Sequence, residues 1–145
     1  MNSAKFFSSA FAITLMLAVA ATALGHTLIW DDQADGVYPE PNTWPGHSHV
    51  DIMVSRGGND DVAGQGDSDA MALGDGVDIG LGYNGRDDIE GGPGVDGISG
   101  DPGADLLKGG GAGDVLRGNG GNDELRGGNR NDTLHGGSGH DVCYG

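Results

Sequence analysis

Aspartate recurs at every ninth residue of this chain from residue 60 to residue 141, without a gap or a change of phase. Aspartate fills 19 of the 145 positions, so ten consecutive occurrences at one spacing are not an accident of composition. A strict period of this kind marks a structural repeat unit. These lattice aspartates are Asp60, Asp69, Asp78, Asp87, Asp96, Asp105, Asp114, Asp123, Asp132 and Asp141.

The unit around each lattice aspartate has a constant plan when that aspartate is counted as its sixth residue. Positions 1 to 4 hold glycine or a small turn residue, and position 8 is usually apolar, as in residues 91–99, 118–126 and 127–135. Each of these reads G-G-x-G-x-D-x-U-x, where U is apolar, give or take one letter. Glycines at positions 1, 2 and 4 permit a tight turn, and the last three positions are long enough for one short strand.

A turn followed by a strand, repeated many times, predicts a coil. Two units close one full turn of 18 residues, so the strands of alternate units stack in two parallel sheets with the position-8 residues between them. The lattice aspartates then form two columns. The first column is Asp60, Asp78, Asp96, Asp114 and Asp132, and the second is Asp69, Asp87, Asp105, Asp123 and Asp141. The predicted fold is an all-β parallel solenoid.

Two columns of carboxylates predict a metal ion. Carboxylates one strand spacing apart, about 4.8 Å, repel one another unless a cation lies between them. Calcium accepts six to eight oxygen ligands in a forgiving geometry, and turn carbonyls lie beside each aspartate. Magnesium needs stricter geometry, and zinc or copper prefers the His and Cys that the lattice lacks apart from His135, His140 and Cys143. Four gaps in each column predict up to about eight Ca²⁺ ions.

The same pattern predicts that folding depends on the metal. One buried aliphatic side chain per unit offsets only part of the entropy lost when nine glycine-rich residues become ordered. We therefore expect the repeat region to be disordered without Ca²⁺ and to fold when it binds.

Residues 1–25 are typical of a secretory signal peptide. Lys5 precedes an apolar run from Ala10 to Leu24, which is shorter than the roughly 20 residues that span a bilayer and ends in small residues. An uncleaved anchor is the alternative. After cleavage, 22 acidic side chains face six basic ones, a formal charge of −16. This charge repels nucleic acid and anionic membrane surfaces. The sequence thus predicts a secreted protein that makes no membrane contact after signal cleavage.

The mature chain divides at residue 55. Residues 26–54 are non-repetitive and carry most of the large side chains, so we expect them to cap one end of the solenoid. Residues 55–145 are the repeats, although Asp51 lies nine residues before Asp60 and extends the lattice one unit earlier. The units at 64–81 are weak because Leu73 stands at position 1 and Gly80 at position 8. The better-formed roll is predicted at 82–142.

Residues 55–145 resemble the repeats-in-toxin, or haemolysin-type, calcium-binding nonapeptide repeats. The resemblance implies a right-handed parallel β-roll in which the position-6 aspartates and turn carbonyls bind Ca²⁺. Asp67, Ala112 and Arg130 depart from the glycine of position 4. Many members leave the cell by a type I exporter that reads a C-terminal signal, whereas this chain has an N-terminal signal and is expected to use the general secretory route. The repeats usually serve a neighbouring protease, lipase, toxin or adhesin domain.

Several other interpretations stay open. The chain is expected to have no enzymatic activity and a structural or interaction role, or to be a module or fragment of a larger secreted enzyme, toxin or adhesin. The repeats run to Gly145, so an end-to-end contact with a second copy or an unknown protein partner is possible. Cys143, the single cysteine, forms no internal disulfide and faces the core at the last position 8.

Weaker signals concern the remaining histidines and aromatic residues. Cleavage after Gly25 exposes His26 as an N-terminal copper ligand, with His47 and His49 downstream, although these two are better read as exposed loop residues. Trp30 and Trp44 are either a sugar platform or, more simply, packing in the cap. A flexible Gly/Asp-rich linker is the alternative to the solenoid. Ser138 and His140 are close in sequence but lie in a glycine-rich turn without an oxyanion site, so no catalytic pair is predicted.

Overall fold

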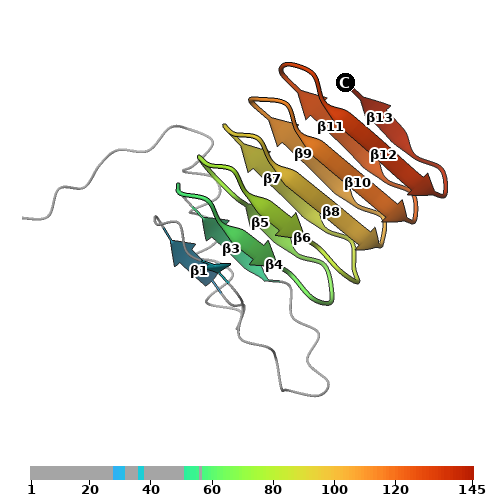
Figure 1. Cartoon of the computed structure of the whole chain (residues 1–145). Coiled ribbons are helices and arrows are strands. Elements are labelled where there is room, and N and C mark those ends of the chain that lie inside the picture. The colour runs from blue at the N-terminus through green and yellow to red at the C-terminus, as the bar shows by residue number, and fades with distance from the viewer. Residues whose placement is uncertain (1–27, 32–35, 38–50, 56) are drawn as a thin grey trace, which may run out of the picture.

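A computed structural model describes residues 28–31, 36–37, 51–55 and 57–145, and shows two parallel β-sheets wound from one chain. Figure 1 shows the strands stacked as the rungs of a solenoid, with β1 near one end and β13 at the other. One sheet runs in the order β1 (Leu28–Asp31), β3 (Ile52–Ser55), β5 (Ala70–Ala72), β7 (Asp88–Gly92), β9 (Leu106–Gly110), β11 (Glu124–Gly128) and β13 (Val142–Tyr144). The other runs β12 (Thr133–Ser138), β10 (Val115–Gly120), β8 (Gly97–Pro102), β6 (Ile79–Leu81), β4 (Asp61–Ala63) and β2 (Gly36–Val37).

The register of both sheets follows from the nine-residue period of the sequence, because paired residues are two repeats apart. From β3 onward each residue pairs with the residue 18 positions later, as Leu107 does with Leu125 and Leu116 with Leu134. Consecutive units lie in opposite sheets, so two units make one coil. The predicted all-β parallel solenoid with 18 residues per coil is confirmed. No part of the chain that the structure describes is helical, and none of it therefore forms a helix able to cross a membrane.

The position-8 residues meet between the two sheets and form the apolar core. Eight of them are buried, and Leu134 packs against them while partly exposed. The buried ones are Met53, Val62, Met71, Ile89, Ile98, Leu107, Leu116 and Leu125. Their even spacing places one aliphatic side chain per unit in the core, as predicted.

Leu73 joins this core from position 1, which the sequence pattern did not predict. Its side chain is fully buried, and it lies 3.0 Å from the point where a Cβ on Gly80 would stand. The large residue at position 1 thus fills the space that the missing side chain at position 8 leaves open in the same unit. The unit looks defective as a sequence, but its interior is filled.

The two sheets begin before the predicted repeat boundary at residue 55. β3 pairs with β5 in the ordinary register, whereas β1 pairs with β3 at an offset of 24 residues, Leu28 opposite Ile52. The segment assigned to the cap therefore contributes strands to both sheets, because β2 pairs with β4 in the second sheet. The rest of the predicted cap lies outside the described residues, as do the signal peptide at 1–25 and His26, Trp44, His47 and His49.

Candidate metal centre

Each lattice aspartate points into the solenoid, on the same side of the chain as the core residue that follows it. Positions 6, 8 and 1 are two residues apart, so an extended chain directs all three to one face. Asp105, Leu107 and Gly109, which begins the next unit, are all buried, while Leu106 and Lys108 between them are only partly covered. The lattice aspartates from Asp60 to Asp123 are buried, and Asp132 and Asp141 are partly buried in the last coil.

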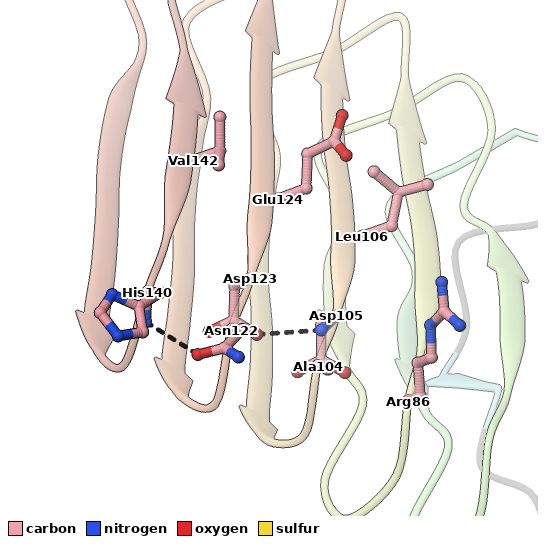
Figure 2. A pocket seen from close by; sticks show the side chains of 9 residues that line it. All are labelled: Arg86, Ala104, Asp105, Leu106, Asn122, Asp123, Glu124, His140 and Val142. Carbon is pink, nitrogen blue, oxygen red and sulfur yellow. Dashed lines mark hydrogen bonds between the residues drawn. The ribbon is translucent and has the colours of Figure 1, made fainter.

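In nine of the ten lattice aspartates, from Asp69 to Asp141, one carboxylate oxygen joins successive coils, whereas Oδ1 of Asp60 is buried without a hydrogen-bond partner. Oδ1 of Asp96 accepts a hydrogen bond from the Asp78 N–H at 3.0 Å, and Oδ1 of Asp114 accepts one from the Asp96 N–H at 2.9 Å. The same bond recurs along both columns at 2.8 to 3.0 Å, and Figure 2 shows the one from the Asp105 N–H to Asp123 Oδ1. Asp51 takes part through its N–H to Asp69, so the lattice extends one unit earlier. The two columns of aspartates predicted from the spacing are therefore present in the folded chain.

The second carboxylate oxygen is buried and has no hydrogen-bond donor. This holds for Oδ2 of the eight aspartates Asp69, Asp78, Asp87, Asp96, Asp105, Asp114, Asp123 and Asp132. A buried polar atom without a partner costs free energy, more so when it is charged, and native proteins rarely tolerate several. A row of such oxygens calls for a cation or for protons.

In seven of these eight units the free oxygen faces the glycine that begins its own unit, whereas the unit of Asp78 begins with Leu73. A Cβ built on Gly91 would lie 2.5 Å from Asp96 Oδ2 and 2.7 Å from the carbonyl oxygen of Gly109 in the next coil. Across the eight units with glycine at position 1, the corresponding distance to Oδ2 is 2.3 to 2.5 Å. A side chain at position 1 would therefore occupy the space into which the carboxylate and, in many units, the next carbonyl project.

Burial also changes the acidity of these carboxylates. Burial raises the pKa of Asp69 to about 7, against a partial lowering by the hydrogen bond from the Asp51 N–H. Burial likewise raises the pKa of Asp96 and of Asp105 to about 6, and neighbouring column members add to the shift by charge repulsion. The pKa values of Asp78, Asp87, Asp114 and Asp123 are raised for the same first reason. Without a cation, these carboxylates therefore take up protons at a higher pH than an exposed aspartate does.

The donor set fits calcium. Carboxylate and carbonyl oxygens converge at five of the eight position-1 glycines, and Ca²⁺ prefers such oxygen ligands. Among the residues that the structure describes, no three His, Cys, Asp or Glu side chains gather closely enough to hold a metal by themselves. Any site here must be completed by backbone carbonyls or water, which favours a hard cation over zinc or copper.

Two predicted ligands have different surroundings from the rest. Asp60 Oδ2 accepts a hydrogen bond from the hydroxyl of Ser55, which stands at position 1. Asp78 belongs to the unit whose position 1 is Leu73. The sequence shows both substitutions, but their importance depends on position 1 facing the carboxylate, which becomes visible only when the chain is folded.

An open hollow of about 320 Å³ lies beside the turns of the second column (Figure 2). It is lined by Arg86, Ala104, Asp105, Leu106, Asn122, Asp123, Glu124, His140 and Val142. The His140 N–H donates to Asn122 Oδ1 at 2.8 Å, and the Ser138 hydroxyl donates to the Asn119 carbonyl at 3.2 Å. These contacts do not join Ser138 to His140. Cys143 is free and exposed at the last rung.

Comparison with known proteins agrees with this geometry. The family model of the RTX calcium-binding nonapeptide repeat matches residues 73–107, 81–116 and 117–145. The chain belongs to this family of calcium-binding β-solenoids, and the predicted resemblance is confirmed. Searches of curated proteins and of solved structures returned no match. The repeats thus form a structural calcium-binding module, which is not catalytic by itself, and proteins with such repeats are typically secreted.

Proposed function

We propose that this chain is a secreted calcium-binding protein whose lattice aspartates hold Ca²⁺ in the turns of the solenoid. The observation that supports it most is the row of buried Oδ2 atoms without donors, found in seven of the eight units that begin with glycine and also in the unit of Asp78. A divalent cation bound there supplies the positive charge that these oxygens lack. The chain's own residues orient the carboxylate, because Oδ1 is held by the N–H of the preceding coil.

Folding and calcium binding are one event in this proposal. The repeat is glycine-rich, and the whole sequence carries a formal charge of −15. Repulsion between these negative charges opposes compaction of the unfolded chain. Folding brings the carboxylates into columns, where only a cation or protons can balance them. The chain thus stays unfolded where calcium is scarce and folds after export into calcium-rich surroundings.

The role of the folded roll is structural or interactive. Support comes from what the described part offers: a regular rod with exposed polar side chains, and no hydrogen bond between Ser138 and His140. The chain has no enzymatic activity of its own in this proposal, and up to about eight ions bind. Its partners are calcium ions and, through an end of the roll, a second copy or another protein. The alternative is a calcium-binding part of a larger secreted enzyme, toxin or adhesin, as the family's usual context suggests.

The predicted domain plan is kept as part of the proposal: a signal peptide at 1–25, a cap at 26–54 and the repeats at 55–145. The strands that the cap contributes to both sheets support its position at the first end of the roll. A copper site at His26 has no observation in its favour among the described residues.

Circular dichroism with and without a chelator tests the coupling. We expect a largely disordered spectrum in EDTA at pH 7.5, with residual β structure confined to residues 51–81, and a full β spectrum after excess CaCl₂, while MgCl₂ at the same concentration leaves the EDTA spectrum unchanged. Identical spectra in EDTA and CaCl₂ would refute metal-coupled folding. Calcium bound per chain, measured by equilibrium dialysis, tests binding separately from folding.

A further inference from the structure

The residue at position 1 differs between the lattice units in a way that follows the surroundings of the aspartate. Eight units have glycine there, and two have a side chain: Ser55 in the unit of Asp60 and Leu73 in the unit of Asp78. Both belong to the first column and lie in neighbouring coils, since the Asp60 N–H donates to Asp78 Oδ1 at 2.8 Å. The exceptions are therefore adjacent.

At Asp60 a hydroxyl takes the place that is open elsewhere. The Ser55 Oγ–H donates to Asp60 Oδ2, and both residues are buried. The oxygen that has no partner in eight other units therefore has one here. A cation at this oxygen would have to displace that hydrogen bond.

At Asp78 the residue at position 1 is the hydrocarbon side chain of Leu73, and Asp78 Oδ2 is buried without a hydrogen-bond donor. Leu73 is fully buried and packs into the core space left by Gly80. In the units with glycine at position 1, a single added Cβ would already stand 2.3 to 2.5 Å from Oδ2. A leucine brings four side-chain carbons to that position, and hydrocarbon offers a cation neither ligands nor room for water.

We propose that position 1 decides which lattice aspartates bind calcium: units with glycine there hold the ion, whereas Ser55 and Leu73 keep Asp60 and Asp78 free of metal. This inference rests on the proposed function and narrows its ligand set. The first column then begins with two metal-free turns, held by a hydrogen bond and by apolar packing, and becomes metal-binding from Asp96 onward. Leu73 and Ser55 are selectivity positions and need not contact the ion themselves.

The sharpest test exchanges the two unusual residues of one unit. The double variant L73G/G80L restores glycine at position 1 and an aliphatic residue at position 8, and it has the same composition and mass as the original chain. Native mass spectrometry of the full chain in calcium acetate counts the bound ions. We expect one more Ca²⁺ per chain than in the original. An unchanged count in a variant with a normal β spectrum would overturn the proposal.

A second pair of variants makes the test independent of core repacking. Asp78→Asn and Asp96→Asn remove the charge of neighbouring members of the same column without changing their size. We expect the first to leave the calcium count unchanged and the second to lower it by one. Equal losses from both would overturn the proposal about position 1. If the original chain binds no calcium at all, the proposed function itself fails, so the two failures are distinguishable.

Discussion

Residues 51–81 and 82–145 share one register but fill their interiors differently. The strands β4 to β6 have three residues each, whereas β7 to β12 have five or six. The earlier region buries methionine, valine and leucine and has side chains at position 1 in two of its units. The later region has glycine at position 1 of every unit and an aliphatic residue at position 8 of every unit except the last, where Cys143 stands.

The difference separates two ways of stabilising one kind of coil. Where position 1 is glycine, the interior keeps space for a carboxylate oxygen that needs a cation. Where it is Leu73 or Ser55, protein atoms occupy that space. The 18-residue spacing is unchanged across both regions, since β5 pairs with β7 as β9 pairs with β11. The backbone register therefore does not depend on what fills the interior, whereas in our proposal the need for calcium does.

Calcium removal should affect the two regions unequally, and this is the largest expected effect. Hydrogen exchange after EDTA at pH 7.5 should show complete loss of amide protection in 82–145. Residues 51–81 should lose less, because apolar packing and the Ser55 hydrogen bond remain. Equal and simultaneous loss in both regions would show that the solenoid unfolds as a single cooperative unit. The two regions would then not differ in how much their stability depends on calcium.

Acidification should partly replace calcium. The pKa of Asp69 is raised to about 7, and those of Asp96 and Asp105 to about 6, so the folded chain binds protons more tightly than the unfolded chain. In calcium-free buffer the resulting stability should be complete below about pH 4 and disappear as the pH rises through 6 to 7. Thermal unfolding at pH 4 and at pH 8 measures it.

Two substitutions assign this pH dependence to the two regions. Asp69→Asn should reduce the loss near pH 7, and Asp105→Asn should reduce the loss near pH 6, to which Asp96 also contributes, because each variant lacks one of the titrating groups. A calcium-free melting temperature that is independent of pH would contradict the buried position of these carboxylates.

Core truncation should cost a similar amount in either region once calcium is saturating. Leu107→Ala and Met71→Ala each remove a buried side chain, and we expect each to lower the free energy of unfolding by about 2–5 kcal/mol. Leu106→Ala is the matched control, because Leu106 lies next to Leu107 on the outer side of β9 and is only partly buried. Urea unfolding in CaCl₂ gives the values. A cost for Leu106→Ala as large as that for Leu107→Ala would contradict the assignment of inner and outer faces.

A smaller effect is expected from glycine at position 2 of the turn. Gly92 has φ of +113°, and a Cβ there would lie 2.4 Å from the Gly74 carbonyl oxygen. Gly92→Ala should therefore destabilise the later region by at least about 1–2 kcal/mol. Gly66→Ala is the control from the earlier region, since no heavy atom lies within 4 Å of its added Cβ. Equal melting temperatures for the two variants would contradict the tight stacking of the turns.

Much of the fold was predictable because the sequence repeats. A nine-residue period with one apolar residue per unit specifies which residues share a sheet and which enter the core, and Leu107 opposite Leu125 follows from it. The pairing of β1 with β3 was not predictable, because an offset of 24 residues breaks the period. Pairing between segments without a repeat depends on contacts that no local pattern encodes.

The aspartates of the candidate site were predictable from the sequence, whereas the contacts of their carboxylate oxygens were not. The ten aspartates and their division into two columns came from spacing alone, and Asp51 continues them. Their role as ligands stays a prediction, as do the signal peptide and the cap. In the packed coils, one carboxylate oxygen accepts a hydrogen bond from a backbone N–H and the other has no donor. This difference between the two oxygens is visible only in the folded structure.

The sequence by itself determined the coil length, the calcium-binding repeat and the two columns, because a periodic chain has few ways to place identical units in equivalent positions. Only the tertiary structure decided that Leu73 compensates for Gly80 and that position 1 faces the carboxylate. These facts concern residues that meet across the interior after the chain has turned. Their consequences depend on distances of a few ångströms, which a one-dimensional pattern does not contain.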